Sequence, residues 1–204
     1  MSLLLESILY QNGRFSLLDY HILRMEKCCR EMGWEFPPDL DRHLKPSTRA
    51  VDGKYKVRIL YNRKIGQSEW IPYKKASPER VGIVNAGDFS YSLKYADRSF
   101  FTEQKAKWSI YDDLIFEKKG LITDSSYCNL LARINDRWLT PAKPLLQGVR
   151  RSYLLDRGLV VTADLSPEHL LEKATEIRLI NALMPFDDCI VLKPEQIFMV
   201  EGGG

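Results

Sequence analysis

The segment Asn85-Ala-Gly-Asp-Phe-Ser-Tyr-Ser-Leu-Lys-Tyr-Ala-Asp-Arg98 divides the chain into two halves. Its first part, Asn85 to Ser90, is mostly small or polar and has no apolar periodicity, which is typical of a linker. A chain of 204 residues is long enough for one large domain or two small lobes. We therefore expect two lobes with an α+β fold, one over residues 1–87 and one over residues 88–204.

The half before this segment is predicted to be mainly β, with one long helix. Leu3 to Tyr10 is rich in strand-forming residues, and Asn12-Gly13 favours a type I′ turn, so these residues predict a hairpin that returns through Arg14 to Leu17. Apolar residues at helical spacing predict a helix from Leu18 to Met32, which Gly33 can end. The remaining expected elements are a short helix over 40–50 and strands over 55–61, 68–73 and 80–84.

The half after the segment is predicted to contain many short strands and no β-α-β alternation. Turn signals such as Lys119-Gly120 and Asn135-Asp136 separate paired apolar runs, which predicts two hairpins. The expected helices cover 99–109, 148–157 and 168–174. The expected strands cover 113–116, 121–125, 129–134, 138–140, 159–163, 176–180 and 189–192.

Composition excludes several classes of protein. The 30 Lys and Arg against 27 Asp and Glu give a charge of +3, too small for the concentrated basic face of a nucleic-acid binder. No run approaches the roughly 18 apolar residues of a membrane span. The four cysteines include no C-x-x-C pair and the three histidines are scattered, so we expect no metal site. A soluble cytoplasmic protein with reduced thiols is the expectation.

Two positions suggest anion binding without proving it. A helix that opens at Gly148 presents free backbone N–H groups, which suit a phosphate, although an ordinary junction between loop and helix is the commoner explanation of such a glycine. His21 and Arg24 lie three residues apart on one helix face and can point to one place, although surface helices usually carry such residues for solvation.

Lys94 and Asp124 are candidates for chemistry. A lysine held among bulky apolar neighbours would lose solvation and have a lowered pKa, as a Schiff-base lysine requires, yet most lysines are merely solvated. Asp124 follows a predicted strand and fits either a hairpin end or the acidic partner of a cationic ring. Taken one at a time, these residues do not assign a function.

Taken together and in order, the motifs resemble the class IV aminotransferases, the pyridoxal-phosphate enzymes of fold type IV. The motifs run from residue 6 to about residue 194. They are Glu6-Ser-Ile8 with Asn12-Gly13 and Phe15, His21-Ile-Leu-Arg24-Met25, Lys56-Val-Arg-Ile59, Leu93-Lys-Tyr-Ala-Asp-Arg98, Lys119-Gly-Leu-Ile-Thr-Asp124 with Cys128-Asn-Leu130, Leu139-Thr-Pro141, Leu146-Gln-Gly-Val-Arg-Arg151 and Ile180-Asn-Ala-Leu-Met-Pro185.

This resemblance implies a two-lobe architecture like that of D-amino acid aminotransferase, with pyridoxal 5′-phosphate between the lobes and a homodimeric assembly. Lys94 would form the Schiff base with the cofactor, and Arg24 would clamp its phosphate. Asp124 falls where the family places a glutamate against the pyridine nitrogen. The other residues implied in binding are Gly148, Val149, Arg150, Asn181 and Ala182 for the cofactor, and Arg58 for the substrate carboxylate.

The motifs around Lys94 and Asn181 look more like the aminodeoxychorismate lyase branch. That branch implies conversion of 4-amino-4-deoxychorismate to 4-aminobenzoate and pyruvate, a step that supplies a folate precursor. The alternatives are an amino acid aminotransferase of the branched-chain or D-amino acid type, and a catalytically idle relative that binds the cofactor. Two departures from the family pattern are the shorter Asp124 in place of glutamate and an N-terminal lobe that we expect to be shortened.

Overall fold

A computed structural model describes residues 2–37, 39–45 and 53–200. The chain forms two compact units. Unit 1 consists of Met1–Lys75, Leu93–Asp97 and Ala182–Pro185, and unit 2 consists of Ala76–Ser92, Arg98–Asn181 and Phe186–Gly204. The chain thus passes between the units several times, whereas the sequence predicted one linker near residue 88.

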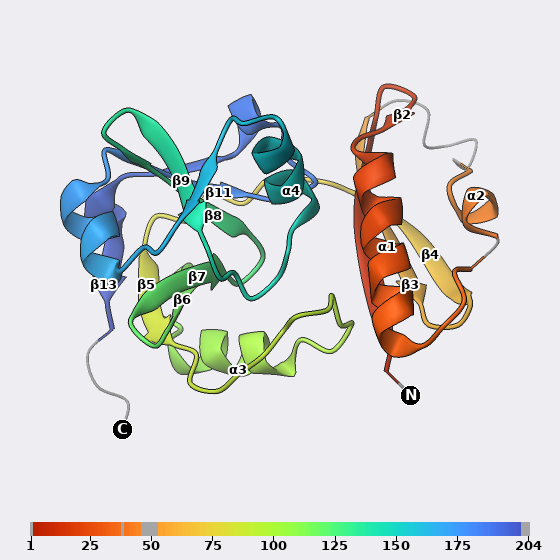
Figure 1. Ribbon diagram of the computed structural model, residues 1–204, viewed down its shortest axis with the longest axis horizontal. Coiled ribbons are helices and arrows are strands. Elements are labelled where there is room, and N and C mark those ends of the chain that lie inside the picture. Colours follow the sequence, from red (N-terminus) through yellow and green to blue (C-terminus); the bar gives the residue numbers. More distant parts are fainter. Residues whose placement is uncertain (1, 38, 46–52, 201–204) are drawn as a thin grey trace. The chain divides into compact units, whose positions relative to one another are not determined.

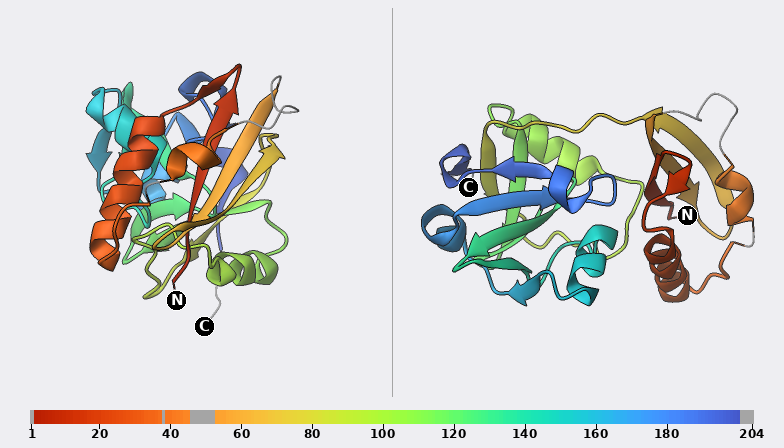
Figure 2. Two further views of the ribbon diagram at one scale, coloured as in Figure 1. Left: turned by 90° about the vertical axis from the view of Figure 1, so that its right-hand side faces the viewer. Right: turned by 90° about the horizontal axis from the view of Figure 1, so that it is seen from above.

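Unit 1 packs one long helix on a four-stranded sheet of order β2-β1-β3-β4 (Figures 1 and 2). Its strands are antiparallel, and a second, one-turn helix accompanies the long one. The elements are β1 (Leu4–Gln11), β2 (Arg14–Phe15), α1 (Leu18–Met32), α2 (Leu40–His43), β3 (Lys54–Tyr61) and β4 (Ile65–Pro72). The helix predicted over 40–50 is observed as α2, and residues 46–50 lie outside the described part of the chain.

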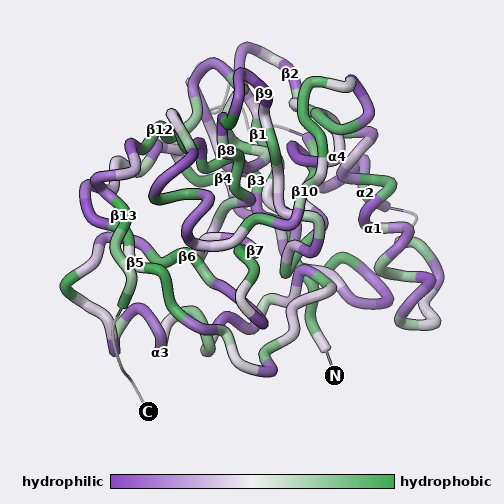
Figure 3. The backbone as a smooth tube through the Cα atoms, turned by 60° about the vertical axis from the view of Figure 1, so that its left-hand side comes forward, coloured by the Kyte–Doolittle hydropathy of each residue, from purple (hydrophilic) through white to green (hydrophobic). Residues whose placement is uncertain are grey.

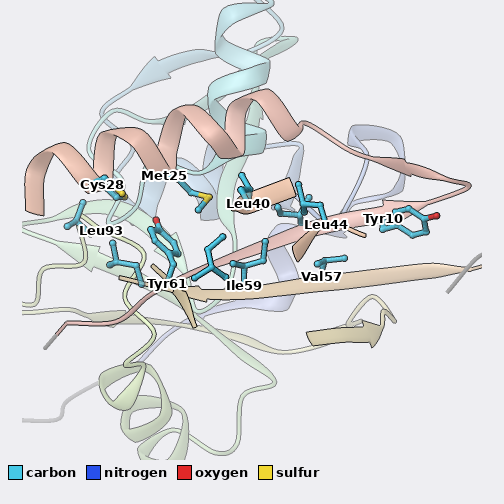
Figure 4. Close-up of a cluster of buried hydrophobic side chains, with 13 residues drawn as sticks. Tyr10, Met25, Cys28, Leu40, Leu44, Val57, Ile59, Tyr61 and Leu93 are labelled. Atoms are coloured by element: carbon cyan, nitrogen blue, oxygen red, sulfur yellow. The ribbon is translucent and has the colours of Figure 1, made fainter. Parts of the chain in front are cut away.

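Local sequence signals explain this layer. Asn12 and Gly13 have φ of 51° and 77°, as the type I′ turn between β1 and β2 requires. Gly33 ends α1 with φ of 65°, a left-handed conformation that glycine adopts at little cost. Strand β3 alternates as predicted, so that one face enters the core between α1 and the sheet (Figure 4). This core consists of Leu4, Ile8, Tyr10, Met25, Cys28, Cys29, Leu40, Leu44, Val57, Ile59, Tyr61, Ile65 and Leu93.

Unit 2 contains a nine-stranded mixed sheet. The main order is β10-β9-β8-β7-β6-β5-β13, and β11 joins it by pairing with β8 and β12. Its elements are β5 (Val81–Asn85), α3 (Ser99–Lys107), β6 (Asp113–Lys118), β7 (Leu121–Ser125), β8 (Asn129–Ile134), β9 (Arg137–Pro141), α4 (Val149–Asp156), β10 (Val161–Ala163), a π-helical turn (His169–Lys173), β11 (Glu176–Ile180), β12 (Ile190–Leu192), β13 (Ile197–Met199) and 3-10 turns at Phe186–Asp188 and Pro194–Gln196.

Two expectations for unit 2 were wrong. Strands β5 and β6 are parallel, with α3 in the connection between them, so the chain does contain a β-α-β unit. Strand β13 was not predicted; it pairs in parallel with β5, from Ile197 opposite Val81 to Met199 opposite Ile83. Figure 3 shows apolar stretches in β5 and β6, and the buried residues are Val81–Val84 in β5 and Leu114–Phe116 in β6. Strands buried on both faces lack the alternation by which sequence analysis finds pairing and direction.

Among the residues that the structure describes, no helix is long and apolar enough to cross a membrane.

Candidate active site

A buried polar cluster in unit 2 lies where β7, β8 and α4 approach one another. Asp124 at the end of β7 is 5% exposed, and its carboxylate accepts hydrogen bonds from Asn129 Nδ2 at 2.7 Å and from the Leu146 amide at 2.8 Å. Burial raises the pKa of Asp124 to about 7, although both hydrogen bonds lower it. A carboxyl group in this state can exchange a proton near neutral pH, which suits the partner of a titrating ring nitrogen.

Asn129 also fixes the start of α4. Its Nδ2 donates to the Leu146 carbonyl at 2.9 Å, and its Oδ1 occupies the space beside Gly148. A Cβ atom at residue 148 would lie 1.8 Å from that oxygen, so only glycine fits. Gly148 is the N-cap of α4 and provides no side-chain cap, which leaves the first backbone N–H groups of the helix available to an anion.

Replacing Gly148 by alanine is therefore expected to displace Asn129 and break its hydrogen bonds to Asp124 and Leu146. We expect the free energy of unfolding to fall by about 1–3 kcal/mol, as for other overpacked sites, and the cofactor affinity to fall with it. Urea unfolding measures the first effect and a spectroscopic titration the second. Gly66→Ala is the control, because a Cβ there meets only the Leu60 carbonyl at 3.9 Å. Equal stability of the two variants would contradict the prediction.

Two adjacent arginines follow Gly148 in the first turn of α4, and both are buried. Arg151 donates to Thr140, Gln147 and the Pro141 carbonyl, so all three of its nitrogens are used within unit 2. In the described part of the chain, Arg150 Nε is buried without a hydrogen-bond partner. Burial lowers the pKa of both guanidinium groups.

Asn181 and Ala182 follow β11, where the sequence predicted a second small-residue turn. Asn181 Nδ2 contacts Cys128 Sγ at 3.3 Å, next to the Asp124 cluster in sequence, and burial raises the pKa of that thiol. Ala182 is 8% exposed and is assigned with the next three residues to unit 1.

Unit 1 contains a second buried polar network, between β1 and α1. Glu6 on β1 is fully buried; it accepts from Arg24 Nε at 2.9 Å and Nη2 at 2.5 Å, and it lies 2.7 Å from His21 Nδ1. Burial alone would raise the pKa of Glu6, but its interactions with Arg24 and His21 outweigh burial and hold that pKa far below its usual range. The pKa of His21 is lowered by burial, and the nearby charge of Lys94 acts in the same direction. One edge of the Arg24 guanidinium, formed by Nε and Nη2, is therefore occupied by hydrogen bonds to Glu6.

Lys94 lies beside the same strand. Its carbonyl accepts a hydrogen bond from the Leu5 amide at 2.9 Å, and the Ala96 amide donates to the Leu3 carbonyl at 2.8 Å. These contacts add the segment 93–97 to the edge of β1 that β2 leaves open. The backbone of the predicted Schiff-base lysine is therefore held by the strand that carries Glu6.

Arg58 occupies the other face of the unit 1 sheet. It lies opposite Ser7 in the register of β1 and β3, whereas Glu6 lies opposite Ile59 on the face that α1 covers. Arg58 Nη1 is 3.2 Å from Glu69 Oε2 on β4, and both side chains are partly exposed. Arg58 and Arg24 therefore lie on opposite faces of the unit 1 sheet.

The predicted site residues fall into two sets. Arg24, Lys94, Arg58 and Ala182 belong to unit 1, and Asp124, Gly148–Arg150 and Asn181 belong to unit 2. Sequence reasoning assigned no role to Glu6, Asn129 or Arg151. For Glu6 a signal was present, since it is an acidic residue on the inward-facing side of an apolar strand.

Unit 2 fits the pyridoxal phosphate that the sequence implies. The uncapped start of α4 offers backbone donors to a phosphate. The buried Arg150 Nε, which has no hydrogen-bond partner in the described part of the chain, offers a further donor. Asp124 offers a buried carboxyl group to a ring nitrogen. These donors and this acceptor match the two polar ends of the cofactor.

Comparisons with known proteins agree with this geometry. The profile of the family described as amino-transferase class IV matches residues 3–186. A Haemophilus influenzae protein without an assigned function is 30% identical over 183 residues, which cover 88% of this chain and 97% of that protein.

Solved structures extend the comparison. The solved structure of a candidate 4-amino-4-deoxychorismate lyase from Haemophilus somnus has a TM-score of 0.81 and a sequence identity of 30%. The match covers 90% of this chain and 97% of that chain. The solved structure of a candidate amino-acid aminotransferase from Mesorhizobium loti has a TM-score of 0.81 and a sequence identity of 20%. The match covers 98% of this chain and 100% of that chain, and it shows a shared fold. The expected fold type IV architecture is confirmed by these matches.

Proposed function

Because this chain belongs to the amino-transferase class IV family, whose members are pyridoxal-phosphate-dependent lyases and transaminases, we propose that it converts 4-amino-4-deoxychorismate to 4-aminobenzoate and pyruvate. The observation that carries this proposal is the 30% identity to the candidate lyase from Haemophilus somnus over 90% of the chain. The aminotransferase-like structure is only 20% identical and supports no choice of substrate.

Pyridoxal phosphate, when bound, supplies an aldehyde that combines with amines and a protonated ring that withdraws electrons from a neighbouring carbanion. Asp124 would keep the pyridine nitrogen of the cofactor protonated, because a carboxylate and a protonated nitrogen that lie side by side each favour the charged form of the other. Backbone N–H groups of Val149 and Arg150, behind Gly148, would bind the phosphate. Asn181, Ala182 and Arg24 are the further residues that we assign to cofactor binding.

Lys94 is the proposed base and acid. Its amine would remove the proton from C4 of the substrate. The electrons of that C–H bond would form a new double bond in the six-membered ring of the substrate as the C–O bond to enolpyruvate breaks. The ring becomes aromatic, which provides the driving force. The protonated Lys94 would return its proton to the departing enolpyruvate to give pyruvate. Arg58 would bind a substrate carboxylate with its planar guanidinium.

The test supplies 4-amino-4-deoxychorismate to purified protein and measures 4-aminobenzoate and pyruvate, which we expect in equal amounts. The protein should be yellow, and borohydride should attach the cofactor to the peptide that contains Lys94. If the protein only exchanges amino groups between amino acids and 2-oxo acids, it is an aminotransferase. If it stays colourless after reconstitution with pyridoxal phosphate, the proposed enzyme function is wrong.

A further inference from the structure

The two buried arginines at the start of α4 have different surroundings. Arg151 uses Nε, Nη1 and Nη2 on Thr140, Gln147 and Pro141, with distances of 2.7–3.2 Å. Arg150 is only 7% exposed, and among the described residues its Nε has no hydrogen-bond partner. Arg151 is therefore held as part of the unit 2 structure, whereas Arg150 is not held by hydrogen bonds through Nε.

Among the residues that the structure describes, no carboxylate stands as a counter-charge to Arg150. Its guanidinium carbon lies 5.7 Å from the centre of the Tyr153 ring, and the groups that favour its charged form are Tyr153 and Cys189. A phenol and a thiol are weaker counter-charges than a carboxylate. A buried charge without an opposite charge or full hydrogen bonding is costly, so this position favours an anionic ligand.

The position of Arg150 relates this charge to the phosphate site. It is the second residue of α4, so its own amide is among the free donors of the first turn. The Cα–Cβ bonds of a helix tilt toward its N-terminus, which directs the side chain to the end where anions bind. Gly148, the N-cap residue, provides no side-chain cap at that end of the helix.

We propose that the guanidinium of Arg150, in addition to its backbone amide, is a direct ligand of the cofactor phosphate. This inference rests on the proposed function and deepens it. A phosphate dianion favours a cation beside the backbone donors of the first turn, and Arg150 supplies it together with a charge-assisted hydrogen bond.

The experiment compares binding of pyridoxal phosphate and pyridoxal, which differ only in the phosphate. Apoprotein is titrated with each compound by absorbance. We expect Arg150→Gln to raise the Kd for pyridoxal phosphate about 10- to 100-fold, the effect of losing a charge-assisted hydrogen bond, while the Kd for pyridoxal stays within about twofold of the wild-type value. Arg150→Lys, which keeps the charge, should recover part of the affinity.

Arg157→Gln is the matched control. Arg157 is exposed at the other end of α4, and its guanidinium carbon lies 5.3 Å from the centre of the same Tyr153 ring. This variant should bind both compounds as the wild type does. An equal loss of pyridoxal phosphate and pyridoxal in Arg150→Gln, or no loss of either, would overturn the assignment of Arg150.

Stability of the apoprotein gives an independent measurement. If Arg150 is a ligand, removing its buried charge should leave the urea midpoint of the apoprotein unchanged or raise it. Arg151→Gln should lower that midpoint, because it breaks three hydrogen bonds. A lowered midpoint in Arg150→Gln would overturn the proposal, since it would indicate a structural role. Wild-type protein that binds no pyridoxal phosphate would overturn the proposed function as well.

Discussion

Lys94→Ala is expected to lower the rate of 4-aminobenzoate formation by at least about 10²- to 10⁴-fold, the usual range for loss of a positioned acid or base. The physical reason is that one amine both joins the cofactor and moves the proton at C4. The structure holds the Lys94 backbone against β1, so the substitution should not disturb the fold. The measurement is the initial rate with saturating pyridoxal phosphate.

Two comparisons make this result specific to Lys94. Lys27→Ala on α1 removes a lysine that is 58% exposed and should retain the wild-type rate. A small primary amine added to Lys94→Ala should restore part of the activity, because it can enter the space left by the side chain and move the proton. A Lys94→Ala protein that keeps more than a small fraction of the wild-type rate would show that another residue is the base.

The second large effect concerns stability. Glu6→Gln is expected to lower the free energy of unfolding by about 3–5 kcal/mol, as for a buried ion pair that loses one partner. Arg24 would then keep its charge beside a neutral amide, whose NH₂ group cannot accept a hydrogen bond from Arg24 or His21. Urea unfolding at pH 7 measures the effect. The free energy of unfolding of such domains is about 5–15 kcal/mol, so the expected loss is a large share of the total stability.

The same residue predicts a pH dependence. The pKa of Glu6 is lowered on folding, so its stabilisation is present above its ordinary value of 4.5 and is lost as the pH falls toward the folded value. The difference in the free energy of unfolding between the wild type and Glu6→Gln should therefore become smaller below about pH 4.

Glu69→Gln is the matched control for Glu6→Gln. It removes the partner of Arg58 in a pair whose side chains are 28% and 37% exposed, and solvent screens that pair. We expect a loss of at most about 1 kcal/mol at pH 7. Equal losses in the two variants would contradict the importance of the Glu6 network.

Elements with strong local signals were predicted correctly from the sequence. The Asn12-Gly13 turn, helix α1 with its terminal Gly33, and the alternation of β3 depend on neighbouring residues only. Strand β13 was missed because it is three residues long and its partner Val81 lies more than a hundred positions earlier. Pairing at such a distance leaves no trace in local periodicity.

The site was predicted less completely, for a similar reason. Spacing on one helix face placed His21 and Arg24 together, and the structure confirms that both contact one residue. That this residue is Glu6 depends on how α1 packs on β1, which spacing cannot give. Arg150 and Arg151 are neighbours with the same side chain. Only the packed structure separates the arginine with three partners from the one whose Nε has none among the described residues.

The way in which the two units share the chain affects its synthesis. Leu93, buried in the core of unit 1, and the segment Ala182–Pro185 both leave the ribosome after parts of unit 2. The edge of β5 stays uncovered until β13, more than a hundred residues later in the chain, has emerged. A nascent chain halted at residue 150 would therefore expose apolar side chains and an unpaired strand, the features that lead to aggregation. Unit 1 therefore cannot be completed before Ala182–Pro185 has emerged, and unit 2 cannot be completed before β13 has emerged.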